Sequence, residues 1–146
     1  MTADCTPSRT IDSVTIGQTV PELVIPITRT MIVATALASR DYEDVHHDPD
    51  CARDKGSADI FMNILTSNGL VERYVRGWSG PAAQLTALKI RLGVPNYPGD
   101  TMRLNAKVTA IDSGTGRVVL DVTGSNSLGT HLGGTAELQF GPVLRL

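Results

Sequence analysis

Several features that mark large classes of protein are scarce in this chain of 146 residues. It has no block of basic residues and a formal net charge of -2, so it lacks the positive surface that nucleic-acid binding requires. No apolar run approaches the roughly 18 residues of a membrane span. The N-terminus lacks the basic and then apolar segments of a signal peptide. We therefore expect neither a nucleic-acid partner nor a membrane.

Cysteine and aromatic residues are scarce too. Cys5 and Cys51 are too few and too far apart for a disulfide framework or a metal site, and two free thiols are typical of the cytoplasm. Aromatic residues make up only 4% of a chain that is 41% hydrophobic, so aliphatic side chains must fill the core. The length predicts a single domain, residues 1–146, in which the polar residues 1–19 are loosely ordered.

Ionisable side chains are most concentrated in one short polar segment that follows an apolar run. Four acids and two histidines share eight residues, Asp41-Tyr42-Glu43-Asp44-Val45-His46-His47-Asp48. A straight helix would not align Asp41 with His46, whereas a bent loop brings both side chains to one point. Histidine titrates near neutrality and a carboxylate can orient or activate it, so the pair suits acid–base catalysis. On composition alone, a solvated loop that caps the next helix remains an equal alternative.

Two helices are indicated after this loop. Asp48 and Pro49 predict a short helix that ends near Gly56. Asp59 is expected to cap a longer helix, residues 60–76, whose apolar residues recur at helical spacing. Because the first half of that helix is apolar nearly all round, we expect it to be the buried central helix.

Strands are indicated where the hydrophobic period changes to two. Alternation of apolar and polar residues predicts an antiparallel sheet with one buried face, over residues 88–92, 102–110, 118–123 and, more weakly, 136–140. Residues 23–27 predict a short edge strand, because Pro26 cannot donate to a ladder. Residues 30–37 predict a strand that turns into a helix. One long helix followed by such strands favours an α+β domain with the sheet wrapped around the helix.

The polar loop resembles a motif of the MaoC-like hydratases and dehydratases, which belong to the hot-dog superfamily. Their motif D-x-N-P-x-H is matched at Asp41 and His46, although Glu43 and Asp44 replace its Asn-Pro. The D-P and alanine that follow the motif are matched within residues 48–52.

Further strings extend this resemblance over roughly residues 30–140. They are Asp59-Ile60-Phe61-Met62-Asn63-Ile64-Leu65-Thr66, Arg91-Leu92-Gly93-Val94-Pro95, and the closing N-x-x-G…G-x-A pattern in residues 126–136. Together with the loop, they resemble the small subunits of actinobacterial enoyl-CoA hydratases that act on shortened steroid side chains in cholesterol catabolism.

The resemblance implies a hot-dog fold and a hydratase of 2-enoyl-CoA thioesters, with Asp41 and His46 as the catalytic pair. It implies that a backbone N–H near Asn63, where the family has a glycine, holds the thioester oxygen. No metal or redox cofactor is expected, because the thioester itself acidifies the α-position and coenzyme A arrives as part of the substrate. The resemblance also implies a hetero-oligomer with a second, larger MaoC-like subunit.

Alternatives remain for the function and for single residues. A hot-dog thioesterase would direct water at the carbonyl carbon, and a non-catalytic partner subunit would keep only the fold, although such partners typically lose the Asp or the His. Asn63 could instead be a polar residue satisfied inside an apolar helix. We expect His47 and His131 to be exposed, and Lys89 and Arg91 to lie on a solvated strand face.

Overall fold

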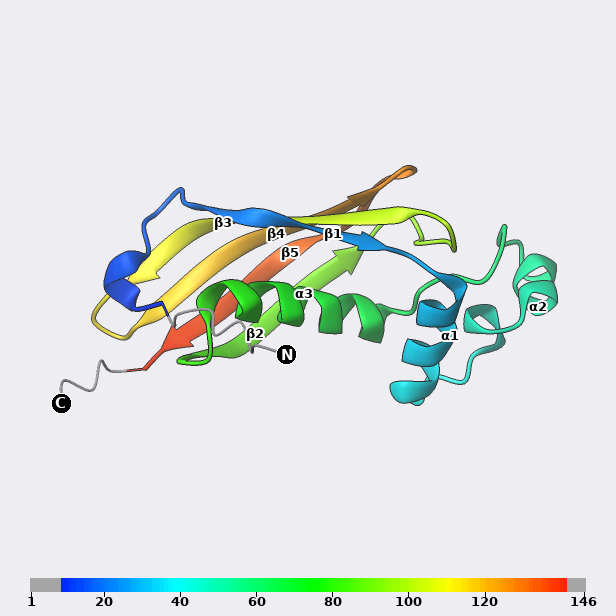
Figure 1. Ribbon diagram of the computed structural model, residues 1–146, viewed down its shortest axis with the longest axis horizontal. Coiled ribbons are helices and arrows are strands. Elements are labelled where there is room, and N and C mark those ends of the chain that lie inside the picture. The colour runs from blue at the N-terminus through cyan, green and yellow to red at the C-terminus, as the bar shows by residue number, and fades with distance from the viewer. Residues whose placement is uncertain (1–8, 142–146) are drawn as a thin grey trace, which may run out of the picture.

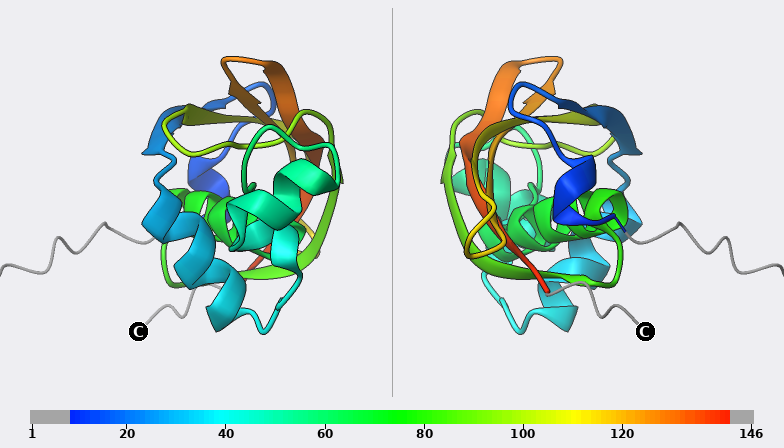
Figure 2. Two further views of the ribbon diagram at one scale, coloured as in Figure 1. Left: turned by 90° about the vertical axis from the view of Figure 1, so that its right-hand side faces the viewer. Right: turned by 90° about the vertical axis from the view of Figure 1, so that its left-hand side faces the viewer.

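The computed structural model describes residues 9–141, which build an antiparallel sheet curved around one long helix (Figure 1). The helix is α3, Ile64–Ser79, and the views along it show the strands lying around it (Figure 2). The strand order is β1-β3-β4-β5-β2, and the strands are β1 Thr19–Pro26, β2 Ala83–Leu92, β3 Thr101–Asp112, β4 Arg117–Asn126 and β5 Gly129–Phe140. The predicted α+β class, with the sheet wrapped around the helix, is confirmed.

Alternation along the strands decides which face of the sheet packs on α3. On β3 the residues from Met102 to Val108 alternate strictly between buried and exposed, and β4 continues the pattern from Val118. The inward side chains are aliphatic, as the shortage of aromatics required. β1 lies at one edge of the sheet, as predicted, but it runs from Thr19 to Pro26 and not over residues 23–27. β2 and β5 are longer than their alternating segments indicated.

The predicted start and end of the central helix are wrong. α3 begins at Ile64 because the side chain of Asn63, not that of Asp59, accepts a hydrogen bond from a backbone N–H of the first turn. It ends at Ser79, and the next residue, Gly80, has a φ of 81° that suits glycine. Ile64 and Leu65 are about half exposed, at 47% and 48%, so the first turn is not buried all round as expected.

Two short helices lie beyond the N-terminal end of α3 (Figure 1). Residues 30–37 contain no strand: they belong to α1, Arg29–Ala38, which the side chain of Thr28 caps. The correction follows from that cap and from helix-forming alanine and leucine, which outweigh the β-branched residues. α2, Pro49–Asp54, is the predicted short helix, and Asp48 caps it.

The expectation of a loosely ordered N-terminal segment is wrong for residues 9–18. Arg9 donates to the carbonyl of Trp78 and lies over its ring, the short 3-10 helix Ile11–Ser13 follows, and Val14 is buried. Residues 1–8, including Cys5, lie outside the described residues, whereas Cys51 is a free thiol. Between residues 9 and 141, no helix is long and apolar enough to cross a membrane.

An ion pair ties the start of α1 to the segment that leads into α3. Arg29 binds both carboxylate oxygens of Asp59, at 3.0 and 2.6 Å, and this lowers the pKa of Asp59 from 3.8 to about 2. A depressed pKa means that the pair stabilises the fold above the unfolded value, and that this contribution is lost as the pH falls towards 2.

We therefore expect Asp59→Asn to lower the melting temperature at pH 7, and its difference from the wild type to shrink as the pH falls from about 4 to about 2. Thermal unfolding followed by circular dichroism across this range checks the result. Asp50→Asn is the matched control, because Asp50 also pairs with an arginine but its side chain is 93% exposed. A difference for Asp59→Asn that does not change with pH would contradict the assignment.

Candidate active site

A sharp turn after α1 brings Asp41 and His46 together. Arg40 adopts a left-handed φ of 56°, and the N–H of Asp41 then donates to the carbonyl of Ala36. The 3-10 helix Asp44–His46 turns the chain back. His46 Nε2 comes to lie 3.4 Å from Asp41 Oδ2, so the bent loop predicted from the sequence is present.

The surroundings of His46 fix which ring nitrogen carries the proton. The side chain is only 10% exposed, and its ring meets Phe61 edge to face. Nδ1 lies 2.7 Å from the carbonyl oxygen of Phe61, and because a carbonyl can only accept, Nδ1 must donate. In the neutral imidazole Nε2 is therefore an acceptor, directed towards the carboxylate of Asp41.

Asn63 holds Asp41 in its ionised form. Its Nδ2 donates to Asp41 Oδ2 at 2.9 Å, and this hydrogen bond is the largest cause that keeps the pKa of Asp41 below its usual range. The backbone N–H of Glu43 adds a weaker hydrogen bond to Oδ1. Asp41 Oδ2 and His46 Nε2 are thus two acceptors that face each other, an arrangement that suits a water molecule donating one hydrogen to each.

The side-chain amide of Asn63 also caps the first turn of α3. Its Oδ1 accepts from the N–H of Thr66 at 2.9 Å, while Nδ2 also donates to Ser39. The side chain is buried and satisfied, which agrees with the alternative interpretation of Asn63, although it lies at the helix cap and not within the helix. This side-chain link to Asp41 was not predicted, because Asn63 was placed within the helix and not at its cap.

A hollow of about 300 Å³ opens beside His46. It is lined by residues 61–64, at the N-terminal end of α3, and by residues 92–95 and His131. The first N–H groups of a helix have no partner within it, and the helix dipole favours negative charge there. The position of Asn63 and Ile64 therefore suits an oxygen that becomes negative. The role of an N–H near Asn63 in holding a thioester oxygen stays a prediction.

The prediction for His131 is wrong, whereas those for three other residues are confirmed. His47, Lys89 and Arg91 are exposed. His131 is only 1% exposed because β5 bulges: Ser125 pairs with Thr130 and Gly124 with Leu132, so His131 is skipped. Both His131 and Leu132 then point inward, which strict alternation would not allow. The sequence offers little signal for such a bulge.

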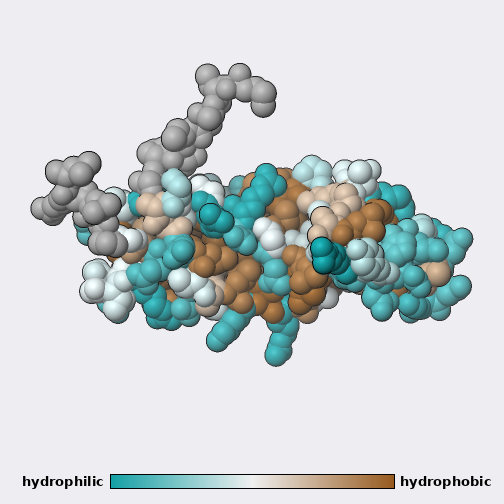
Figure 3. All heavy atoms as spheres, turned by 90° about the horizontal axis from the view of Figure 1, so that it is seen from below, coloured by the Kyte–Doolittle hydropathy of each residue, from teal (hydrophilic) through white to brown (hydrophobic). Residues whose placement is uncertain are grey.

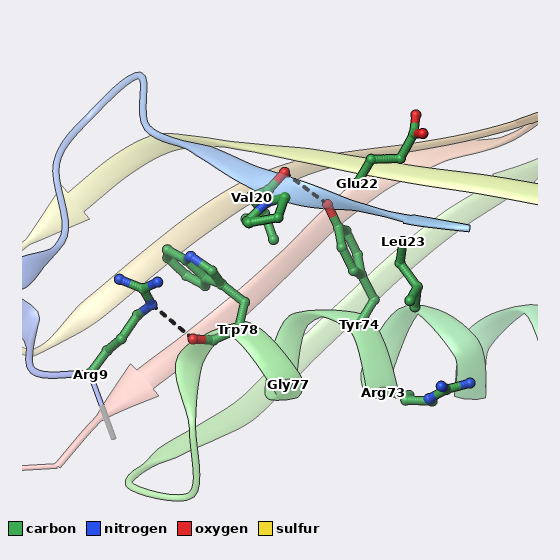
Figure 4. Close-up of a pocket in the computed structure, with 9 residues that line it drawn as sticks. Arg9, Val20, Glu22, Leu23, Arg73, Tyr74, Gly77 and Trp78 are labelled. Carbon is green, nitrogen blue, oxygen red and sulfur yellow. Dashed lines mark hydrogen bonds between the residues drawn. The ribbon is translucent and has the colours of Figure 1, made fainter. Parts of the chain in front are cut away.

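A larger hollow, of about 500 Å³, lies at the other end of α3 between the helix and β1 (Figure 4). Tyr74 and Trp78 extend from α3 towards β1, and the Tyr74 hydroxyl donates to the carbonyl of Val20 at 3.3 Å. Burial raises the pKa of Tyr74 to about 12. Neither Asp41 nor His46 lines this hollow, so it is separate from the candidate site.

Comparisons with known proteins agree with this arrangement. The chain is 49% identical over 123 residues to the 3-oxo-4,17-pregnadiene-20-carboxyl-CoA hydratase beta subunit of Mycobacterium tuberculosis, covering 84% of this chain and 94% of that protein. It superposes on a chain of the ChsH1-ChsH2 complex from Mycobacterium tuberculosis with a TM-score of 0.84 and 47% identity, covering 87% of this chain and 98% of the other. No protein-family model matches.

A more distant likeness concerns the fold alone. The (R)-hydratase from A. caviae involved in PHA biosynthesis is 18% identical, with a TM-score of 0.81 over 88% of this chain and 98% of that one. With these neighbours, the hot-dog architecture predicted from the motif resemblance is confirmed.

Proposed function

Since this chain belongs to the MaoC-like family of hot-dog hydratases, we propose that it supplies the catalytic pair of an enoyl-CoA hydratase. Its substrate would be a 2-enoyl-CoA thioester, which gains water across the 2,3 double bond. The observation that carries the proposal is the approach of His46 Nε2 to Asp41 Oδ2, beside a hollow at the N-terminal end of α3.

The proposed reaction begins with a water molecule held by the two acceptors, Asp41 Oδ2 and His46 Nε2. A water molecule donates to Asp41 and to Nε2 of His46, and one of them takes its proton as the water oxygen bonds to the β-carbon. The electrons of the double bond move onto the thioester oxygen, where N–H groups near Asn63 stabilise the negative charge. The same pair then returns a proton to the α-carbon, so the net change is addition of H and OH. No step requires a metal or a redox cofactor.

The substrate and the partner are proposed from the relatives. One relative is named a hydratase beta subunit that acts on a steroid-side-chain CoA thioester, and one solved relative is a complex of two subunits. We propose that this chain likewise hydrates a steroid enoyl-CoA in the cytoplasm, within a hetero-oligomer that includes a larger MaoC-like subunit.

Exposed apolar side chains near the site favour such a partner. Leu37, Ile64 and Leu65 are each about half exposed, and Tyr42 is 65% exposed. The underside of the molecule also shows a broad hydrophobic area (Figure 3). A hollow of about 300 Å³ is small for a polycyclic acyl group, so a second subunit that covers these side chains would enlarge the pocket.

The test is a hydration assay on short, long and steroid 2-enoyl-CoAs, followed by loss of the enoyl absorbance, with and without the larger subunit. We expect the pair to hydrate the steroid substrate, and the isolated chain to be a homodimer with weak activity, as measured by light scattering and the same assay. Full steroid activity of the isolated chain would contradict the need for a partner. Hydrolysis of saturated acyl-CoA without hydration would indicate a thioesterase instead.

A further inference from the structure

His131 is a buried histidine that the proposed reaction does not use. It lines the same hollow as His46 but comes from β5. Its Nδ1 lies 2.7 Å from the carbonyl oxygen of Val94, and its Nε2 lies 2.9 Å from the hydroxyl oxygen of Ser67. Val94 belongs to the loop after β2, whereas Ser67 belongs to α3.

The direction of each hydrogen bond follows from the partners. The carbonyl of Val94 can only accept, so Nδ1 of His131 donates to it. In the neutral ring Nε2 then accepts, and the Ser67 hydroxyl donates. Burial lowers the pKa of His131, which favours this neutral form. The ring therefore joins one donor on the helix to one acceptor on the loop.

Ser67 and Val94, which His131 joins, each belong to a segment of the candidate site. Ser67 lies one turn after Asn63 on α3, and its N–H donates to the carbonyl of Asn63. Asn63 in turn orients Asp41. Val94, at the other end, lines the same hollow as His46, and its N–H donates to the carbonyl of Thr130 of β5. A change in the length of the connection would shift α3 relative to residues 92–95.

We propose that Ser67 and His131 form a hydrogen-bonded bridge that sets the width of the hollow, with His131 as a positioning residue for the hydration reaction. This inference rests on the proposed function. The bridge holds the N-terminal end of α3, which is expected to bind the thioester oxygen, at a fixed distance from residues 92–95. The thioester is then aligned with the water at Asp41 and His46, and small misalignments reduce rates strongly.

Two single variants remove the same hydrogen bond from opposite ends. Ser67→Ala removes the donor. His131→Asn keeps an amide N–H near the position of Nδ1, for Val94, but is too short to reach Ser67. We expect each variant to lower kcat on a 2-enoyl-CoA by roughly tenfold while KM changes little, because alignment in the transition state is lost and not binding. The double variant should lose no more than either single variant, because both remove one interaction.

Tyr74→Phe is the matched control for stability. It removes another buried hydrogen bond of α3, from the far end of the helix to Val20 (Figure 4). It should lower the melting temperature about as much as Ser67→Ala and leave kcat unchanged. Wild-type kcat in Ser67→Ala and His131→Asn, or losses that multiply in the double variant, would overturn the bridge.

A readout without substrate separates this inference from the proposed function. In protein labelled with ¹⁵N-histidine, we expect NMR to show His131 with the proton on Nδ1 from about pH 5 to 8. We also expect its Nε2 resonance to move in Ser67→Ala and not in Tyr74→Phe. A ring that titrates in this range, or an Nε2 resonance unaffected by Ser67→Ala, would overturn the bridge. Absence of hydration by the wild type would instead overturn the proposed function.

Discussion

Replacement of either Asp41 or His46 should nearly abolish hydration while the fold persists. We expect Asp41→Asn and His46→Ala each to lower kcat by roughly 10²- to 10⁴-fold, the range for loss of a positioned acid–base group. Asp41→Asn removes the negative charge and the proton affinity of one of the two groups proposed to bind the water, and His46→Ala removes the other group altogether. Because both act on one water molecule, the double variant should be little slower than the slower single variant. Steady-state hydration of a 2-enoyl-CoA measures the effect.

The same loop provides matched controls. Asp44 and His47 are the same residue types, but both are exposed, and they lie 3.9 Å from each other. Neither of them is bound by Asn63 or lines the hollow beside His46. Asp44→Asn and His47→Ala should keep kcat near the wild-type value, and circular dichroism should show that all four variants are folded. Near wild-type hydration by Asp41→Asn or by His46→Ala would remove that residue from the mechanism.

The sequence was sufficient for those parts of the molecule that depend on local pattern. Alternation from Met102 and from Val118 located β3 and β4, because one face of each strand is buried and the other is not. Asp48 and Pro49 located α2, because capping is decided within a few residues. The proximity of Asp41 and His46 was also predicted, since only four residues separate them.

The parts that could not be predicted depend on contacts distant in sequence. The site joins Asp41 to Asn63, 22 residues away, and Ser67 to His131, 64 residues away. His131 points inward only because β5 bulges against β4, a feature that alternation within one strand does not reveal. Asp59 matches the helix-cap pattern as well as Asn63 does, yet its carboxylate is bound by Arg29, so the helix begins later.

The role found for Asn63 changes the expected result of replacing it. If only its backbone N–H mattered, Asn63→Gly would retain activity. The side chain, however, holds Asp41 through Nδ2 and caps α3 through Oδ1. We therefore expect Asn63→Gly to lower kcat on the order of 10²-fold, the cost of misplacing a reacting group by about 1 Å. It should also lower the melting temperature, since the helix loses its side-chain cap.

Asn63→Ser separates the two roles of the side chain, capping α3 and holding Asp41. It should also change how the activity depends on pH. A serine hydroxyl can still cap the N–H of Thr66, so stability should stay near that of the wild type, but serine no longer provides the amide donor that holds Asp41. The hydrogen bond from Asn63 is the largest cause of the lowered pKa of Asp41, so its loss raises that pKa. Asp41 must be ionised to take a proton from water, and the activity of Asn63→Ser should therefore fall at a higher pH than that of the wild type as the solution is acidified. The pH profile of kcat/KM measures this shift. An unchanged acid limb, together with wild-type kcat in Asn63→Gly, would show that only the backbone of residue 63 takes part.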